Sequence, residues 1–334
     1  MTNAAVLCGI GAALPPRTVT NDMLSERLNT SDEWIRTRTG IRERRYAEPG
    51  TSTGDLAVEA GGRALQSAGS GAADLVVLAT ATPDHPLPGT APAVASRLGL
   101  RHVPAFDIAA VCSGFVYALS TAVDAIRAGS AQRVLVIGAD TYSSILSPSD
   151  RGTAVVFGDG AGAAVLRAGE PDEPGALLGF ELGSDGEGAD LIMVPGGGSR
   201  QRSGGGSVPD PDTAWFTMQG RAVFTRAVDR MEGATRGLLD RIGWPVDSVD
   251  RIVAHQANLR ILHAITERLD VPRERAVVHL DRVGNTSAAS IPLALADAAV
   301  SGALEPGHRV VMTAFGGGLT WGSAALVWPE VQAG

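Results

Sequence analysis

Lysine is absent from this chain of 334 residues, so all 28 of its basic side chains are arginines. The absence excludes every chemistry that needs a lysine amine: a Walker A phosphate loop, a pyridoxal Schiff base and a lysine general base. Cysteine is also scarce. Cys8 and Cys112 are too few for a disulfide framework, and we therefore expect a cytoplasmic enzyme.

Long hydrophobic runs and an excess of positive charge are lacking as well. No stretch approaches the roughly 18 uninterrupted apolar residues that a membrane span needs, so we expect no contact with a membrane. The net charge of −8 argues against a nucleic-acid partner. The 44% of hydrophobic residues is typical of a globular chain, which at this length forms one large domain or two.

Residues 105–119 predict a buried strand, a sharp turn of small residues and an apolar helix. Cys112 lies at the start of that helix, where unpaired N–H groups and the helix dipole favour an anion. We therefore expect the pKa of its thiol to be lowered. The pattern fits a nucleophilic cysteine at the bottom of a pocket, and it fits equally a small core residue, because free cysteine is among the most buried residue types.

The two halves of the chain repeat one pattern. A strand at 75–77, a strand–turn–helix unit around Cys112 and a strand at 134–137 recur at 252–254, around Asn285 and at 310–313, offset by roughly 173 to 177 residues. Strands that alternate with helices predict parallel sheets covered by helices. We therefore expect two units, residues 1–170 and 171–334, packed with pseudo-twofold symmetry. Cys112 and Asn285 then occupy equivalent helix starts, and His255 follows a nearby strand.

Glycines cluster at 158–162, between two short apolar runs. We expect a tight turn there, with strands at 153–157 and 163–166. Because a strand rather than a helix follows these glycines, they do not form a dinucleotide-binding fingerprint.

Arginine is concentrated at 36–45, beside Trp34, where five of ten residues are arginines. A solvated charged face is one interpretation. The other is a site for phosphate groups, with the indole stacked on a base.

Cysteine, histidine and asparagine at comparable strand ends suit acyl chemistry. A thiolate can take up an acyl group, while a neutral imidazole and an amide can donate hydrogen bonds to a developing oxyanion. Taken singly, each candidate also fits a structural role: His255 as a core histidine, Asn285 as a helix cap and the glycines at 316–318 as an ordinary turn.

A set of motifs that runs through the whole chain closely resembles the β-ketoacyl-acyl-carrier-protein synthase III family, the condensing enzymes that initiate fatty-acid and some polyketide chains. The motifs are Ser31-Asp-Glu-Trp-Ile, Arg38-Thr-Gly-Ile-Arg42, Cys112 in its strand–helix setting, Asp150-Arg-Gly, Phe157-Gly-Asp-Gly-Ala-Gly162, His255-Gln-Ala-Asn258, Gly284-Asn-Thr-Ser-Ala-Ala-Ser-Ile-Pro292 and Phe315-Gly-Gly-Gly-Leu-Thr-Trp-Gly322. The resemblance implies an α/β thiolase-like fold with two pseudo-symmetric βαβαβ-type halves in α-β-α-β-α layers, and a homodimer.

The resemblance also implies a two-stage reaction. Cys112 attacks an acyl-CoA primer, and the backbone N–H groups of Cys112 and Gly317 hold the acyl oxyanion. Malonyl-acyl carrier protein then enters, and His255 and Asn285 hydrogen-bond its thioester oxygen as carbon dioxide leaves. The carbanion attacks the acyl-cysteine and gives a β-ketoacyl-carrier protein. No metal and no cofactor is implied, because the coenzyme A thioester is a substrate.

The resemblance assigns further residues to the two substrates. Trp34 and Arg151 would sandwich the adenine of coenzyme A, and the other positions that match its binding tunnel are Thr30, Arg38, Gly220 and Asn258. Arg260 matches a residue of the carrier-protein docking face. Thr225 and Glu267 stand where better-known members carry lysines, for which Arg221, Arg226 and Arg268 are candidate substitutes.

Leu87 falls where some members place a phenylalanine that crosses the dimer interface and closes the acyl pocket. A smaller side chain there leaves room for primers longer than acetyl. The specific pathway, general fatty-acid synthesis or a specialised natural product, does not follow from the sequence.

Four other functions compete with this interpretation. A related acyltransferase would pass the acyl group to an alcohol or amine without decarboxylation, and Asn285 argues against it. A thiolase would need a second catalytic cysteine, for which Cys8 is badly placed. A non-catalytic partner subunit would have lost the nucleophile, and a cysteine hydrolase would have no use for the repeat or for the coenzyme A motifs.

Overall fold

The computed structural model describes residues 4–204 and 211–334. Two central sheets organise this part of the chain, with strand orders β1-β7-β6-β4-β5 and β11-β12-β13-β8. The first contains β1 (Ala4–Ala13), β4 (Leu75–Ala79), β5 (Ala105–Ile108), β6 (Arg133–Thr141) and β7 (Asp159–Gly169), and the second β8 (Leu177–Ser184), β11 (Arg251–Ala254), β12 (Arg309–Gly316) and β13 (Thr320–Val327). Two short pairs add β2 (Arg17–Thr20) with β3 (Glu43–Tyr46), and β9 (Ile192–Met193) with β10 (Thr217–Met218).

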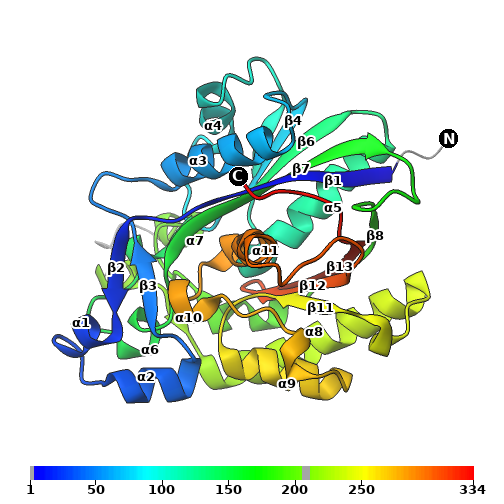
Figure 1. Cartoon of the computed structure of the whole chain (residues 1–334). Coiled ribbons are helices and arrows are strands. Elements are labelled where there is room, and N and C mark those ends of the chain that lie inside the picture. The colour runs from blue at the N-terminus through cyan, green and yellow to red at the C-terminus, as the bar shows by residue number, and fades with distance from the viewer. Residues whose placement is uncertain (1–3, 205–210) are drawn as a thin grey trace.

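Helices cover both outer faces of the two sheets and fill the space between them (Figure 1). The helices are α1 (Asn21–Ser25), α2 (Asp32–Thr39), α3 (Thr53–Ser67), α4 (Ala91–Arg97), α5 (Gly114–Arg127), α6 (Arg151–Ala154), α7 (Ser199–Arg202), α8 (Gly220–Ile242), α9 (Leu259–Leu269), α10 (Leu280–Val283) and α11 (Ser290–Val300). Residues of α3 and α4 form one buried cluster with the first sheet, residues of α8 and α9 another with the second, and α5 and α11 pack between the sheets. This confirms the predicted α-β-α-β-α layers.

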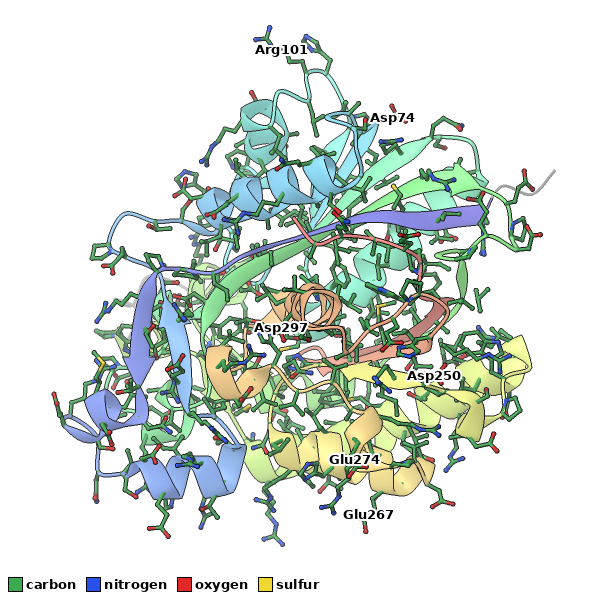
Figure 2. The ribbon with its side chains drawn as sticks, viewed as in Figure 1. Asp74, Arg101, Asp250, Glu267, Glu274 and Asp297 are labelled. Carbon is green, nitrogen blue, oxygen red and sulfur yellow. The ribbon has the colours of Figure 1, made fainter. Side chains whose placement is uncertain are left out.

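The predicted repeat is visible in the topology. In the first sheet β6 pairs with β4 in parallel and with β7 antiparallel, and in the second β12 pairs in the same way with β11 and β13. Asp74, just before β4, accepts hydrogen bonds at 2.9 Å from the N–H groups of Gln132 and Arg133 at the start of β6. Asp250, just before β11, accepts one at 2.8 Å from Arg309 N at the start of β12. Figure 2 labels both carboxylates, one beside each sheet.

The prediction for residues 153–166 is wrong. A short helix, α6, ends at Ala154, and a single strand, β7, runs from Asp159 to Gly169. The glycines permit the close approach of α11 rather than a turn: a Cβ atom at Gly162 would lie 2.7 Å from Cβ of Pro292, and one at Gly160 would lie 2.9 Å from Cδ1 of Leu293.

No helix in the described part of the chain is both long enough and apolar enough to span a membrane.

Candidate active site

Cys112 lies in a 3₁₀ turn, Val111–Ser113, between β5 and α5. Val111 has φ +46°, in the left-handed region that a β-branched residue rarely adopts. The hydroxyl of Ser113 lies 2.7 Å from Oγ1 of Thr320, which is the first residue of β13. The turn that carries the thiol is therefore tied to the C-terminal half of the chain.

Gly316 ends β12, and Gly317 and Gly318 begin the turn that leads to β13; Gly316 approaches the cysteine closely. A Cβ atom at Gly316 would lie 2.7 Å from the backbone nitrogen of Cys112, so no other residue type fits there. A Cβ atom at Gly317 would lie 3.1 Å from the carbonyl oxygen of Ile192. Close packing therefore requires glycine in this segment, and the segment lies against the backbone of the candidate nucleophile.

One segment, residues 285–290, connects all three candidate catalytic side chains. Asn285 is its first residue, and its Oδ1 accepts a hydrogen bond at 2.9 Å from Ser287 N. Oγ of Ser287 lies 3.5 Å from Sγ of Cys112. Oγ of Ser290 lies 2.6 Å from Nδ1 of His255. Cysteine, histidine and asparagine therefore meet around a single turn.

His255 follows β11, and its backbone N–H donates to the Thr313 carbonyl at 2.8 Å. Its side chain is buried, and burial lowers the pKa of the imidazole from 6.5 to about 3. The ring is therefore neutral at physiological pH, so one of its nitrogens carries a proton and the other a lone pair.

The thiol does not have the lowered pKa that a helix N-terminus predicts. Burial raises the pKa of Cys112 to about 12, and the carboxylate of Asp140 adds to the rise, while the hydrogen bond with Ser287 opposes it. The expectation is wrong because loss of hydration in this enclosed position outweighs the favourable end of α5. In the free protein Cys112 is a thiol at neutral pH.

A cavity of about 660 Å³ leads from the surface to Asn285. Four of the predicted site residues line it along the way, namely Trp34, Arg38, Gly220 and Asn258, and Arg260 lines it too. Asn258 also caps the N-terminus of α9, because its Oδ1 accepts from Arg260 N at 2.9 Å, and its amide donates to the Arg38 carbonyl at 3.1 Å. The cavity therefore joins the arginine-rich surface to the turn that carries the catalytic candidates.

Two arginines stack on Trp34 at the cavity mouth. The guanidinium carbon of Arg151 lies 4.7 Å from the centre of the indole ring, and that of Arg38 lies 5.1 Å away. Arg151 also donates to the Asn29 carbonyl at 2.7 Å. The guanidinium of Arg151 thus occupies one face of the indole directly.

The remaining predicted residues lie at the edge of the site or away from it. Oγ1 of Thr30 is buried, with no hydrogen-bond partner among the described residues. Leu87 is 86% exposed and follows β4 on the surface. Arg260 lies with its guanidinium carbon 5.5 Å from the ring of Phe224, and Arg221 and Thr225 line the same cavity. Glu267 lies on α9, with one carboxylate oxygen 4.0 Å from Nη2 of Arg273.

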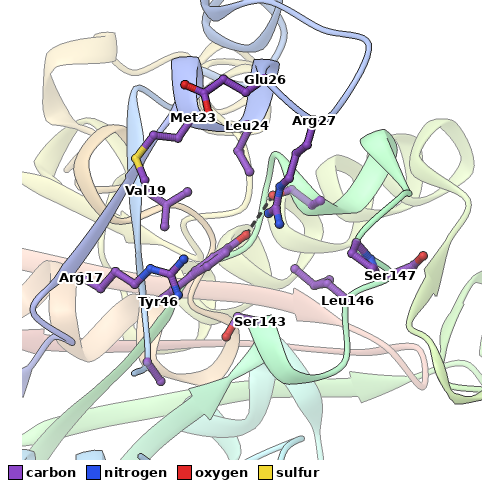
Figure 3. A pocket seen from close by; sticks show the side chains of 13 residues that line it. Arg17, Val19, Met23, Leu24, Glu26, Arg27, Tyr46, Ser143, Leu146 and Ser147 are labelled. Carbon is purple, nitrogen blue, oxygen red and sulfur yellow. Dashed lines mark hydrogen bonds between the residues drawn. The ribbon is translucent and has the colours of Figure 1, made fainter. Parts of the chain in front are cut away.

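A second cavity, of about 390 Å³, lies between α1, the β2–β3 pair and the loop after β6 (Figure 3). Arg17 and Arg27 project into it on either side of Tyr46, whose hydroxyl donates to the Ala154 carbonyl at 3.2 Å. None of the predicted site residues lines it.

Sequence reasoning assigned no role to Asp140, Ser287, Ser290 or Thr320, which the structure places around the candidate triad. The two serines fall inside the motif Gly284–Pro292, but small polar residues near a helix start are usually interpreted as caps. A charged residue inside the apolar run 134–141 was a usable signal for Asp140, since a carboxylate is buried only when it is paired or hydrogen-bonded.

Comparisons with known proteins agree along the whole chain. Residues 106–186 match the family described as 3-oxoacyl-[acyl-carrier-protein (ACP)] synthase III, and residues 239–328 match its C-terminal domain. Beta-ketoacyl-[acyl-carrier-protein] synthase III 5 of Streptomyces coelicolor is 62% identical over 333 residues, which cover 100% of both chains.

Solved structures show the same fold. The crystal structure of 3-oxoacyl-(acyl carrier protein) synthase III from Pseudomonas aeruginosa PAO1 superposes with a TM-score of 0.92, at 49% identity over 98% of this chain and 99% of that one. The priming β-ketosynthase of the R1128 polyketide pathway superposes with a TM-score of 0.89, at 37% identity over 98% of this chain and 96% of that one. The protein belongs to the 3-oxoacyl-[acyl-carrier-protein] synthase III family of condensing acyltransferases, and it has their thiolase-like fold.

Proposed function

We propose that this member of the family primes chains by joining an acyl group, held as a thioester on Cys112, to the malonyl group of malonyl-acyl carrier protein. The observation that carries the proposal is the turn at 285–290. It contacts Cys112 and His255 through two serines, and it presents Asn285 at the inner end of a cavity that opens at Trp34.

In the first stage, Sγ of Cys112 attacks the carbonyl carbon of an acyl-CoA. The N–H groups of Cys112 and Gly317 stabilise the oxyanion, and the close contact of Gly316 with the cysteine backbone supports this arrangement. When the intermediate collapses, coenzyme A leaves as a thiolate. The sulfur of coenzyme A then receives the proton that the Cys112 thiol has lost. Because that thiol is protonated at rest, its proton has to move during acylation rather than before it.

In the second stage, the malonyl carboxylate leaves as carbon dioxide, and its electron pair passes into the thioester carbonyl. His255 and Asn285 donate hydrogen bonds to that oxygen. The role requires the proton of His255 on Nε2, so Nδ1 accepts the hydroxyl hydrogen of Ser290 at 2.6 Å. The carbanion attacks the acyl-Cys112 carbonyl, the cysteine sulfur leaves, and a proton from solvent restores the thiol.

Coenzyme A is proposed to bind along the cavity, with its adenine on Trp34 and its phosphates near Arg38. Arg151 now lies directly on one face of the indole. For the adenine to lie between Trp34 and Arg151, the Arg151 side chain has to move away from the indole first. The exposed side chains of Arg221 and Arg260 at the cavity rim fit docking of an acidic carrier protein. The substrates themselves supply the chemistry, and the proposed mechanism uses no metal or cofactor.

We expect Trp34→Ala to raise the KM for acyl-CoA about tenfold and to leave kcat nearly unchanged, because the indole stacks on a part of the substrate that does not react. Steady-state kinetics at saturating malonyl-carrier protein measures this. Trp244→Ala is the matched control, since it removes an indole from a stack with Arg309 (5.1 Å) outside the cavity. An unchanged KM for Trp34→Ala would exclude the proposed adenine site.

A homodimer is proposed from the edge of the first sheet. β5 is the last strand of that sheet, Phe106 on it is 40% exposed, and Leu87 in the loop after β4 is 86% exposed. An unpaired strand edge with apolar side chains can pair with a second copy of the chain.

The two free cysteines fit the expected cytoplasmic location. Residues 1–170 and 171–334 remain the proposed halves, with the boundary between β7 and β8.

If Leu87 reaches the partner's acyl pocket, the wild-type protein will accept primers longer than acetyl. We expect acylation of Cys112 by isobutyryl-CoA and hexanoyl-CoA as well as by acetyl-CoA. Leu87→Phe adds volume there, and we expect it to reduce the rate with hexanoyl-CoA about tenfold while sparing acetyl-CoA. Acylation rates from intact-protein mass spectra test this, and strict acetyl preference in the wild type would contradict it.

The overall proposal is tested by supplying acyl-CoA and malonyl-acyl carrier protein together. Formation of β-ketoacyl-carrier protein supports it, and hydrolysis of the acyl-CoA to free acid without this product would identify a hydrolase instead.

A further inference from the structure

Asp140 is a buried charged group that the proposed mechanism does not use. It lies near the end of β6 and has no exposed surface. Its Oδ1 accepts hydrogen bonds from Ala81 N (2.7 Å), Thr82 Oγ1 (3.0 Å), Thr80 Oγ1 (3.1 Å) and Thr82 N (3.2 Å). Its Oδ2 accepts from Ala288 N at 3.0 Å. The carboxylate therefore joins the end of the first sheet to the turn that follows Asn285.

Ser287 lies between this carboxylate and the candidate nucleophile. Its Oγ is 3.5 Å from Sγ of Cys112. Burial raises the pKa of Asp140, and a hydrogen bond from the Ser287 side chain is among the contacts that oppose the rise. Tyr142 lies in the turn that follows β6. Burial raises the pKa of Tyr142, and a hydrogen bond with the Ser287 side chain opposes that rise. The pKa values of both groups thus depend on the Ser287 hydroxyl, which itself contacts the sulfur of Cys112.

The hydrogens of this cluster can be assigned from its chemistry. An ionised carboxylate only accepts, and a serine hydroxyl has one hydrogen and two lone pairs. The Ser287 hydroxyl therefore accepts the thiol hydrogen of Cys112 with one of its lone pairs, and its own hydrogen points away from the sulfur. Tyr142 is fixed in turn by a parallel stack on Phe157, with ring centres 4.6 Å apart.

The backbone holds Ser287 in this position. Its φ is +50°, and Val111, in the equivalent turn of the other half, has φ +46°. The N–H of Ser287 donates to Asn285 Oδ1, and the next N–H, of Ala288, donates to Asp140. The left-handed conformation directs these successive N–H groups to two different acceptors and leaves the side chain facing the cysteine.

We propose that Ser287, whose turn is held by the hydrogen bond from Ala288 N to Asp140, is a positioning residue for Cys112: its hydroxyl fixes the sulfur at rest and turns to donate a hydrogen bond to the sulfur as the thiolate forms. This inference rests on the proposed role of Cys112 as the nucleophile. A hydroxyl can serve a thiol as acceptor and a thiolate as donor, whereas an ionised carboxylate such as Asp140 only accepts.

The titratable groups near the sulfur act in opposite directions. Asp140 from β6 disfavours a thiolate by its negative charge, and the Ser287 hydrogen bond favours it. Tyr142, whose pKa burial raises, stays neutral, and His255 at the end of β11 stays neutral because burial lowers its pKa. Removing the hydroxyl of Ser287 therefore leaves the negative charge of Asp140 unopposed, and the pKa of the thiol rises.

The test is the pH dependence of Cys112 alkylation by iodoacetamide in the full-length protein, followed by mass spectrometry of the Cys112 peptide. We expect Ser287→Ala to move the alkylation profile to higher pH and to slow alkylation at pH 8 about tenfold, the effect of one lost hydrogen bond to a charged sulfur. Acylation of Cys112 by acyl-CoA should slow to a similar extent.

Two further variants separate the hydroxyl from general structural damage. Ser287→Gly also lacks the hydroxyl but suits φ +50°, so it should show the same shift as Ser287→Ala. Ser323→Ala removes an equally buried serine hydroxyl, 2.9 Å from Oγ1 of Thr313, and should leave the profile unchanged.

A wild-type profile in Ser287→Ala or in Ser287→Gly would overturn the inference, as would an equal shift in Ser323→Ala. These outcomes leave the proposed function intact, since wild-type Cys112 would still be acylated. Failure of wild-type acylation would instead overturn the proposed function.

Discussion

Cys112→Ala is expected to abolish formation of the acyl-enzyme. The substitution removes only the sulfur from a buried turn, and alanine fits the space, so the fold should survive. With no thiol to accept the acyl group, we expect acyl transfer from acyl-CoA to fall by about a thousandfold or more. The intact mass of the protein after incubation with acyl-CoA measures this directly, because the wild type gains the mass of one acyl group.

Cys8→Ala is the control for this experiment. Cys8 lies in β1, where its thiol contacts the Val165 carbonyl at 3.5 Å, and burial raises the pKa of that thiol. The control should acquire the acyl group at the wild-type rate. Acylation that persists in Cys112→Ala would show that another residue is the nucleophile.

His255→Ala and Asn285→Ala are expected to separate the two stages of the reaction. Both residues donate to the malonyl thioester oxygen in the proposed mechanism, so condensation should fall by about a hundredfold to a thousandfold in each variant. Acylation of Cys112 should fall much less. Burst kinetics of coenzyme A release report the first stage, and carbon dioxide release from malonyl-carrier protein reports the second.

Asn285→Asp is a sharper version of the same test. Oδ1 of Asn285 accepts from Ser287 N at 2.9 Å, and an aspartate keeps that acceptor while it loses the amide donor. The turn should therefore survive, and decarboxylation should be lost as completely as in Asn285→Ala.

If His255→Ala and Asn285→Ala lost acylation to the same degree as Cys112→Ala, the roles assigned to the two residues would be wrong.

The layered fold could be predicted because both halves of the sequence contain the same pattern of strands and helices. Apolar strands and small-residue helix starts recur at a constant offset, and each half has to cover its sheet on both faces. The prediction for the region around Gly160 and Gly162 is wrong because glycine has two structural roles. It permits tight turns and it permits close packing of backbones, and only the position of α11 decides between them.

The candidate site was predictable in its residue types but not in its electrostatics. Strand ends and motifs pointed to Cys112, His255 and Asn285, and the structure brings them to one turn. The pKa of the thiol could not be predicted, because it depends on how deeply Cys112 is buried and on Asp140, a charge that arrives from β6. The roles of Ser287 and Ser290 depend on side-chain directions within a left-handed turn, which the linear motif does not specify.

In the proposed reaction an acyl group on Cys112 is condensed with a malonyl group as carbon dioxide is lost. The most direct measurement isolates the acyl-enzyme, adds ¹⁴C-carboxyl malonyl-acyl carrier protein without further acyl-CoA, and follows a single turnover. We predict one carbon dioxide and one β-ketoacyl-carrier protein for each acyl group that leaves Cys112. If the acyl group left with no carbon dioxide released, and was recovered on an alcohol or amine or as free acid, the protein would be an acyltransferase or a hydrolase and the account would be contradicted.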